Sequence, residues 1–517
     1  MQLVDWIIVA LYLAGMLALA ALTGRKQSSR KDYYLGGNQM SPLSLATSTI
    51  ATQCSTNSLL GAPAFVGFVG GGGLIWLQYE LAVPLAMFLL VYLLTTLRRA
   101  GHVSVYAFLD ERLGSSACLV ASTTFLIFRG IATGVTVYGV AIVVTLLAEV
   151  SYTQAVLLLM GVTIVYDVLG GMRAVVISDV LQMMLITAAT LFSLWLLSDA
   201  VGGWSEIFAA HEETTRIQAL QFSGGFTGQS NYGFWPMLIG GCFLYMAYYG
   251  CDQSQAQRVL ASRSTQDAER VLMYNGMLRF PMVLLYCLLG LALAAYAGKE
   301  PGFLSALPNS AQGTPNYNLV YPIFVLQNFP PIVVGLVMVG IFAAAMSSID
   351  SALNSLSAAT MEDYLKRFAT QSERSAFLTS KLITLAWGLF AIVFSYQVEA
   401  IAPTVLEAIN KIGSVANGPL LALFIVALLF PSAGQRRAII GFAAGLILNL
   451  CLWLFFPQIS WLWWNVSGAL FSLIVTLLGQ PLQFSLPSTK PSRTTFHMML
   501  SMSGLILMIC LIFGVRS

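Results

Sequence analysis

The stretch FAAAMSSIDSALNS, residues 342–355, places a carboxylate and several hydroxyls inside a long apolar segment. On an α-helix the positions i, i+3, i+4 and i+7 share one face, and here they are Ala344, Ser347, Ser348 and Ser351. That face offers a backbone carbonyl and three hydroxyls, and Asp350 lies near it. Oxygen ligands of this kind suit a hard cation such as sodium and suit no redox metal. The stretch therefore predicts a helix that binds sodium.

The stretch TSTIATQCSTNS, residues 47–58, is a second polar interruption of an apolar segment. All of its residues except Ile50 and Ala51 carry a hydroxyl, an amide or a thiol, and a Gly61-x-Pro63 break follows. A membrane helix that is interrupted frees backbone carbonyls, which are good sodium ligands. Hydroxyl-mediated helix packing is the alternative explanation. Because the break and the polar residues coincide, the stretch favours an ion or substrate site.

The composition places the chain in a membrane. Hydrophobic residues make up 57% and charged residues 9% of its 517 residues, and the mean hydropathy is +0.79. Soluble domains carry about a quarter charged residues, so most of this surface must face lipid. The seven cysteines are odd in number and show no paired ligand spacing, which argues against a disulfide framework or a zinc site. We find no phosphate-binding loop motif, and the Gly70–Gly73 run is typical of a flexible connector.

Segments of about 20 apolar residues are long enough to cross a bilayer. Fourteen spans are expected, at residues 5–23, 42–68, 74–97, 117–148, 151–168, 174–199, 235–252, 271–298, 321–358, 378–396, 401–430, 438–456, 459–479 and 495–515. The ninth is long enough to include a bent portion. The first begins at Asp5 without a basic region and is followed by basic residues, which indicates a retained helix and not a signal peptide.

The basic residues predict the orientation of the spans. If the N-terminus is outside, the cytoplasmic loops and the adjoining span edges hold nineteen of the 25 lysines and arginines. The others are Arg216, Lys299 and Arg516 outside, and Arg129, Arg279 and Lys411 within spans. Because basic residues collect on the cytoplasmic side, we expect a multi-pass protein of a bacterial cytoplasmic (inner) membrane with both termini outside.

Three stretches together resemble the sodium:solute symporter family, which contains the sodium/glucose, proline, sialic acid and monocarboxylate symporters. They are residues 344–355, GGMRAVVISDVLQ at residues 170–182, and YYGCDQSQAQR at residues 248–258. The resemblance runs through nearly the whole chain. It implies an all-α polytopic membrane protein with a leucine-transporter-like inverted repeat of five plus five core helices, some of them discontinuous.

The resemblance also implies a division of the chain. An N-terminal extra helix and a cytoplasmic loop occupy residues 1–40, the first inverted repeat 41–199, an external loop 200–234, the second inverted repeat 235–430, and three peripheral helices 431–517. The implied function is sodium-coupled symport, in which a monomer imports a small polar organic solute by alternating access. Its expected partners are the solute, sodium as coupling ion and the bilayer, with neither a cofactor nor a nucleic acid.

Two other classes of function are less consistent with the sequence. An enzyme is not expected, because the three histidines, His102, His211 and His497, lie in loops or at span edges without a hydrolytic constellation. A sensor built on a transporter scaffold is the other alternative, and no signalling domain is expected after the last span.

The family's ion sites carry over to named positions. The common sodium site falls on the backbone carbonyls of Ala51, Cys54 and Ala344 and on the hydroxyls of Ser347 and Ser348. A second sodium site, present in some members, falls on Asp179, Ser347, Asp350 and Ser351. Asp350 departs from the serine or threonine that is usual there, and Asp179 could instead be a helix-end residue near the cytoplasmic interface.

The family's substrate contacts fall on Ser55, Ser58, Gln78 or Glu80, Arg129, Tyr245, Tyr248, Arg279 and Lys411. Arg129 matches an arginine that clamps the carboxylate in sialic acid symporters, and the planar guanidinium fits a carboxylate well. The cations near the site favour an anionic solute, such as sialic acid or another carboxylate. A neutral sugar or polyol is the alternative, because Glu407 and Lys411 lie four residues apart and could neutralise each other. Arg129 itself needs a compensating anion, for which Glu80, Asp350 and the substrate are candidates.

Overall fold

A computed structural model of the chain describes residues 1–25, 27–54, 56–225, 232–309, 313, 315–368, 372–398, 405–479, 483–485, 487 and 489–516, without the side chains of 57, 368, 405–412 and 516. The described residues form helices and one parallel pair of short strands, β1 (Leu220–Gln221) and β2 (Val515–Arg516). In this described part, nine helices are long and apolar enough to cross a membrane.

Helices lie over all fourteen predicted spans. They are α1 (Leu3–Gly24), α3 (Pro42–Gln53), α4 (Thr56–Gly67), η2 (Leu74–Leu81), α5 (Ala82–Ala100), α7 (Ser115–Ala148), α8 (Tyr152–Val201), η4 (Pro236–Gly240), α10 (Gly241–Gly250), α12 (Thr265–Lys299), α14 (Val320–Asn328), α15 (Val333–Ala359), α17 (Glu373–Ser395), α19 (Val405–Leu429), α20 (Gln435–Phe455), α21 (Trp461–Leu477) and α22 (Arg493–Phe513). Short helices connect them: α2 (Arg30–Leu35), η1 (Gly36–Asn38), α6 (Ala107–Arg112), α9 (Trp204–Ala209), η3 (Thr215–Ile217), α11 (Gln253–Leu260), α13 (Pro301–Ser305), η5 (Tyr317–Leu319), η6 (Thr360–Leu365), α16 (Lys366–Phe368) and η7 (Pro431–Ala433).

Several spans depart from a single straight helix. The second is divided into α3 and α4, as the polar stretch predicts. The fifth and sixth are joined in α8, which leaves helical geometry at Gly171 with a φ of +54°. The ninth is divided into α14 and α15, which confirms the expected bend. Pro330 and Pro331 lie between these two helices and cannot donate the backbone hydrogen bonds that a continuous helix needs.

Serine side chains fix where several of these helices begin. Ser41 precedes α3 and accepts a hydrogen bond from the Ser44 amide at 3.1 Å. Ser264 caps α12 in the same way, by accepting from the Asp267 amide at 3.1 Å. Such caps satisfy amides that the first helical turn leaves without partners, so the loop sequences set the helix boundaries.

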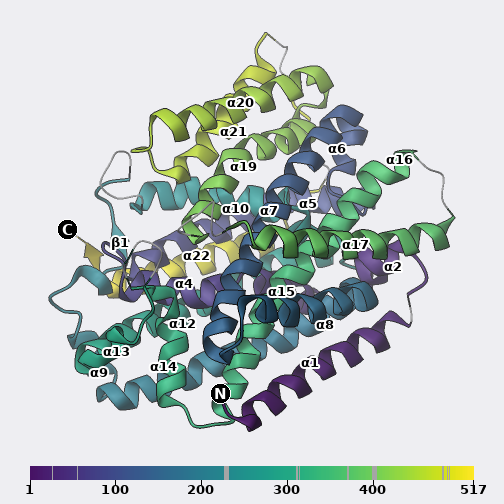
Figure 1. The fold of residues 1–517 in the computed structure, drawn as a ribbon. Coiled ribbons are helices and arrows are strands. Elements are labelled where there is room, and N and C mark those ends of the chain that lie inside the picture. Colours follow the sequence, from purple (N-terminus) through teal and green to yellow (C-terminus); the bar gives the residue numbers. More distant parts are fainter. Residues whose placement is uncertain are drawn as a thin grey trace.

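Helix α15 lies at the centre of the molecule (Figure 1). It packs against α1, α3, α7, α8 and α17, and most of its side chains are buried. Helices α3 and α4 pack in turn against α12. The polar stretch 342–355 is therefore held against the polar stretch 47–58.

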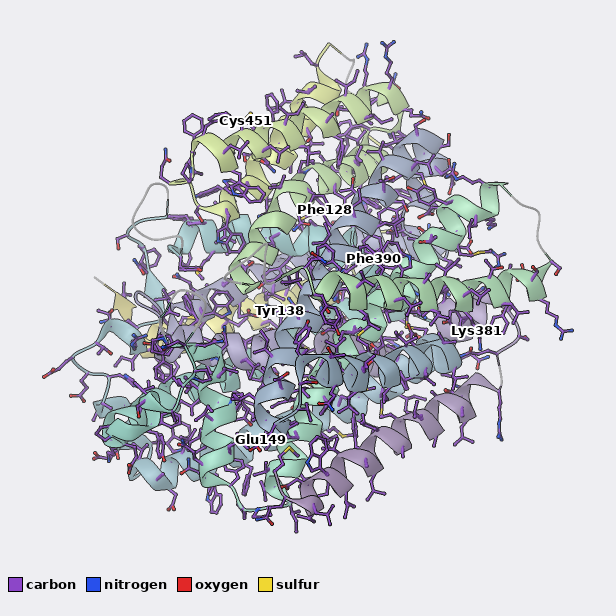
Figure 2. The ribbon with its side chains drawn as sticks, in the orientation of Figure 1. Phe128, Tyr138, Glu149, Lys381, Phe390 and Cys451 are labelled. Carbon is purple, nitrogen blue, oxygen red and sulfur yellow. The ribbon has the colours of Figure 1, made fainter. Side chains whose placement is uncertain are left out.

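The two ends of the bundle differ in their charged residues. Figure 2 shows Glu149, which follows α7, and Lys381, near the start of α17, on different sides of the molecule. On the side of Lys381, which was predicted to be cytoplasmic, ion pairs join α2 to η6 and to α17. Arg30 contacts Glu362 at 2.7 Å and Glu373 at 2.9 Å.

Each end of the described chain contacts a distant segment: the N-terminal end contacts the start of α15, inside the predicted ninth span, and the C-terminal end contacts the loop 200–234, which was predicted to be external. Asp5, near the start of α1, accepts a hydrogen bond from the Gly335 amide at the start of α15. Strand β2, near the C-terminus, pairs with β1 in the loop after α9. In Figure 1 both termini lie toward the side of α9 and α13, away from α2 and α16.

Candidate sodium and substrate sites

The break between α3 and α4 supplies the first part of the candidate sodium site. Helix α3 ends at Gln53, and Cys54 leaves helical geometry with φ −76° and ψ 51°. Cys54 is buried and follows the last turn of α3 directly, within three residues of Ala51. A helix end of this kind leaves carbonyl oxygens without intrahelical partners, which makes them available to a cation.

Two serines of α15 contact this helix end. The Ser347 hydroxyl donates to the Ala51 carbonyl at 3.1 Å and lies 3.1 Å from the Ala344 carbonyl. The Ser348 hydroxyl donates to the Thr52 carbonyl at 3.0 Å. The structure therefore brings the two predicted polar stretches together through the predicted residues. The carbonyls of Ala51, Thr52 and Ala344 and the hydroxyls of Ser347 and Ser348 lie together here. Oxygen ligands of this kind suit sodium.

Sequence reasoning missed Thr52 in this group. Its carbonyl accepts from Ser348, and its hydroxyl lies 3.0 Å from the Ser351 hydroxyl. Its position in the polar stretch 47–58 was the available signal. The family resemblance pointed instead to the carbonyls of Ala51 and Cys54, on either side of Thr52.

The predicted second sodium residues are arranged differently. Asp179 is buried on α8 and accepts a hydrogen bond from Ser48 at 2.5 Å. It also pairs with Arg258 of α11, whose Nη2 lies 3.3 Å from Asp179 Oδ2. The Asp350 carboxylate is buried and lies 3.2 Å from the Ser351 hydroxyl. Arg258 belongs to the stretch 248–258, but its charge was assigned to the cytoplasmic side and its contact with Asp179 was not predicted.

Arg279, one of the predicted substrate contacts, is held by a carboxylate and two phenols. It forms a two-pronged ion pair with Glu80, with Nε–Oε2 and Nη2–Oε1 distances of 2.6 and 2.8 Å. Its Nη2 also donates to the Tyr245 hydroxyl at 2.7 Å, and Nη1 donates to the Tyr249 hydroxyl at 3.0 Å. Four donor contacts occupy most of this guanidinium, so its geometry resembles that of a structural ion pair.

Arg129, the other arginine among the predicted substrate contacts, is half-buried and has different neighbours. It forms an ion pair with Asp252, which caps α11, and its guanidinium lies over the Tyr248 ring at 5.7 Å from the centroid. The partner of Arg129 is therefore Asp252 and neither of the two carboxylates that the sequence suggested, Glu80 and Asp350. Asp252 was part of the stretch 248–258, but nothing in the sequence showed that α10 would bring it beside α7.

Arg129 also borders a small cavity. The cavity has a volume of about 30 Å³, and Arg129, Thr52 and Ser348 are among its lining residues. It is therefore large enough for water and lies directly beside the candidate sodium site. The side chains of Arg129 and Asp252 keep 18% and 19% of their surface exposed, unlike those of Arg279 and Glu80 at 6% and 1%.

The remaining predicted contacts lie elsewhere in the structure. Gln78 is buried, donates to the Tyr232 carbonyl at 2.8 Å and accepts from the Gln221 amide at 3.0 Å. Ser58 donates to the Gln53 carbonyl at 3.0 Å across the helix break. Ser55 and the Lys411 side chain lie outside the described residues.

Proteins named as sodium-coupled transporters match most of the chain. A putative sodium-dependent multivitamin transporter of Drosophila melanogaster is 29% identical over 88% of this chain and 75% of its own length. The sodium/sialic acid symporter NanT of Aliivibrio fischeri is 25% identical over 92% of this chain and 93% of its own length. The sodium-coupled monocarboxylate transporter 1 of Mus musculus is 28% identical over 84% of this chain and 71% of its own length.

Solved structures show the same fold. A sodium-coupled sialic acid symporter, in a substrate-bound outward-open state, superimposes with a TM-score of 0.83 at 21% identity over 94% of this chain and 99% of its own. Mhp1, a nucleobase-cation-symport-1 family transporter, gives a TM-score of 0.56 at 12% identity over 90% of this chain and 97% of its own. The fold is therefore the leucine-transporter fold with discontinuous helices.

The sodium:solute symporter family model matches residues 33–475, which is most of the chain. The expectation from the three sequence stretches is confirmed. The proteins that this chain resembles are transporters and not enzymes. The chain belongs to the sodium:solute symporter family and is a multi-pass, sodium-coupled symporter of a small-molecule solute.

Proposed function

We propose that this chain imports a small organic anion together with sodium, and that the anionic group of the solute binds Arg129. The observation that carries this proposal is the shared cavity. Arg129 and Ser348 line the same small cavity, so an anion on the guanidinium would lie beside a sodium ion at Ala51, Cys54, Ala344, Ser347 and Ser348. Each charge would then stabilise the other in a buried site of low effective dielectric.

Arg279 and Arg129, the two arginines among the predicted substrate contacts, have different roles in this proposal. Arg279 is engaged by Glu80, Tyr245 and Tyr249, and we assign it to fixing α12 against η2 and α10. Arg129 contacts Asp252 and the face of Tyr248, and its side chain keeps part of its surface accessible. A guanidinium has five donors, so Arg129 can hold Asp252 and a second carboxylate at once.

The relatives support an anionic solute. Two of them are named for sialic acid and for monocarboxylates, and both kinds of compound carry a carboxylate. A neutral sugar or polyol is the second candidate, because the Asp252 carboxylate already neutralises Arg129 in the structure.

The test compares Arg129→Gln with Arg263→Gln, a control at an exposed cytoplasmic-side arginine. Purified wild-type protein should be stabilised against heat by sodium and further by a carboxylate solute such as sialic acid or a monocarboxylate. Arg129→Gln should lose stabilisation by the solute and keep stabilisation by sodium, and the control should keep both. Solute binding that survives in Arg129→Gln would contradict the proposed role of Arg129 and would favour a neutral sugar or polyol as the solute.

We also propose the setting in which the transporter works. It lies in a bacterial cytoplasmic membrane with both termini outside, uses two inverted repeats at residues 41–199 and 235–430, and acts as a monomer. The last point is supported by the candidate sites, because α3, α7 and α15 of one chain supply the contacts around the small cavity.

A further inference from the structure

A second cavity lies between the latter half of α5 and the start of α22. Its volume is about 500 Å³, within the range of about 300–1,000 Å³ that is usual for small-ligand pockets. The two helices pack against each other here, and Phe88 of α5 meets Phe496 of α22 with ring centroids 5.9 Å apart. The cavity shares no lining residue with the one beside Arg129, so the binding of a transported solute does not account for it.

Two basic side chains line this cavity without a carboxylate partner. They are Lys490 and Arg493, both exposed, and neither forms an ion pair within the described part of the chain. Glu269 lies near the start of α22, where it accepts hydrogen bonds from the Ser492 amide at 2.7 Å and from the Thr495 hydroxyl, and it is not among the lining residues. The cavity therefore presents two positive charges that are not neutralised by the protein.

The other walls of the cavity suit the boundary between lipid headgroups and hydrocarbon. Phe88, Tyr92 and Phe496 contribute aromatic rings to the lining, and aromatic residues such as tyrosine collect at that boundary. The Thr489 hydroxyl lies 2.9 Å from that of Thr95, which holds the segment before α22 against the end of α5. This segment was predicted to be cytoplasmic, so the cavity lies where a lipid headgroup of that leaflet would be.

Exposed leucines continue from the cavity along both helices. Leu85 and Leu89 of α5 are 39% and 36% exposed, and Leu500 of α22 is 50% exposed. Residues three or four positions apart share a face of a helix, so these leucines follow Tyr92 and Phe496 toward the middle of the membrane. A free phosphate would leave this apolar path unused, whereas the acyl chains of a lipid would cover it.

We propose that this cavity binds the phosphodiester headgroup of an anionic phospholipid, with Lys490 and Arg493 on the phosphate and the acyl chains on the exposed leucines. A guanidinium donates two parallel hydrogen bonds to a phosphate, and basic pockets between membrane helices on the cytoplasmic side suit anionic headgroups. The site is additional to symport, and the proposal depends on neither the identity of the solute nor the sodium site.

Thermal unfolding of the purified full chain in detergent tests the site. Added phosphatidylglycerol should raise the melting temperature more than added phosphatidylcholine, which has the same acyl chains and no net charge. In the Lys490→Gln, Arg493→Gln double variant, the apparent affinity for phosphatidylglycerol should fall about tenfold or more. The matched control is Arg374→Gln with Arg436→Gln, which removes two exposed charges at the starts of α17 and α20, outside the cavity. It should keep the wild-type response.

Three outcomes would overturn the proposal. The first is a wild-type protein that responds equally to the two lipids, and the second is an equal loss of response in the two double variants. The third is stabilisation by glycerol 3-phosphate as effective as that by phosphatidylglycerol, which would identify a soluble phosphate as the ligand. If the Lys490→Gln, Arg493→Gln variant does not fold, the two single variants carry the comparison.

A phosphatidylglycerol with a photoreactive acyl chain gives the position directly. In wild-type protein it should label peptides of α5 and α22 around Leu89 and Leu500, and excess unlabelled phosphatidylglycerol should suppress that labelling. Labelling spread evenly over all lipid-facing helices would show that the lipid forms only a general solvating layer, which contradicts a site between these two helices.

Discussion

Ser348 shows how a single hydroxyl joins the two halves of the candidate sodium site. It donates to the Thr52 carbonyl at 3.0 Å across the interface between α15 and α3. A sodium ion placed there would replace that donor, and the hydroxyl would turn its lone pairs to the ion. The same contact would hold the helices together in the absence of sodium and would supply a ligand in its presence.

Ser348→Ala should therefore reduce the apparent sodium affinity of uptake about tenfold, or about 1.4 kcal/mol. Ser355→Ala is the matched control, because Ser355 is buried on the same helix and its hydroxyl donates to the Ala352 carbonyl of its own helix. The measurement is the sodium dependence of solute uptake in proteoliposomes. Equal sodium affinity in the two variants would remove Ser348 from the sodium site.

Glu80 is expected to matter for stability more than for ion binding. Its carboxylate is almost completely buried and meets Arg279 through two short contacts. Removing one partner of a buried ion pair costs about 3–5 kcal/mol, because the other charge is left without compensation. Glu80→Gln should lower the melting temperature markedly, and Glu80→Gln with Arg279→Gln should recover much of the loss.

Glu111→Gln serves as the control for this change, because Glu111 is exposed and pairs with His102 at the surface. Thermal unfolding of the purified variants in detergent without solute is the measurement. A Glu80→Gln protein as stable as the control would mean that Arg279 has another source of compensation, and Glu80 would return to the list of substrate contacts.

The sequence identified which residues would be important more reliably than it identified their partners. Ser347 and Ser348 were found because hydroxyls inside a membrane helix are unusual, and the structure places them against the predicted helix break. The partners of Arg129 and Asp179 were not found, because Asp252 and Arg258 lie 123 and 79 residues away in the chain. Such pairings depend on how helices pack, which periodicity along one segment does not encode.

At the scale of helices, one carboxylate near the start of α1 holds the start of α15. Asp5 Oδ1 accepts from the Ile332 amide at 2.8 Å and the Gly335 amide at 3.0 Å, at the start of α15. Asp5 thus caps a helix that begins more than 300 residues later in the chain. The first span was predicted as a retained helix, but this cap could not be, because nothing near Asp5 in the sequence specifies α15.

Asp5→Ala should destabilise the protein by about 1–3 kcal/mol, since two amides at the start of α15, that of Gly335 buried, would lose their acceptor. Asp5→Asn keeps one acceptor oxygen and should cost less. Thermal unfolding measures both, and the order wild type, Asp5→Asn, Asp5→Ala is the expected order of stability. Equal stability of all three would show that water replaces the carboxylate at this helix end.

Gly171 is the second feature at this scale, because it lets α8 break between two membrane spans. Its φ of +54° is one that residues with a side chain adopt only with strain. A Cβ there would also lie 2.7 Å from the Tyr33 ring. Gly171→Ala should therefore lower the yield of folded protein, as measured by monodispersity in gel filtration. Gly161→Ala, at a helical position of α8 with open space around the added methyl, should behave like wild type.

At the scale of the whole molecule, the charges and the strand pairing give a consistent orientation. Helices α9 and α13 lie at the lower left of Figure 1, and α2 and α16 lie at the right. The short helices α2 and α16 carry basic residues, namely Arg30, Lys31, Lys366 and Arg367. The pairing of β1 with β2 links the C-terminal end to the first of these two sides. By the positive-inside rule we expect the side of α2 and α16 to face the cytoplasm.

Cysteine labelling in cells tests that orientation. Glu212 is exposed in the loop after α9, and Arg374 is exposed in the first turn of α17, close to α16. A membrane-impermeant maleimide should label Glu212→Cys in spheroplasts from which the outer barrier has been removed, and should label Arg374→Cys only after the inner membrane is opened. The unmodified chain gives the background, which should be low because six of its seven cysteines are buried and the seventh, Cys451, is only partly accessible. Labelling with the two positions exchanged would invert the orientation. The proposal of import would stand, because the sodium gradient and not the orientation of the protein sets the direction of symport.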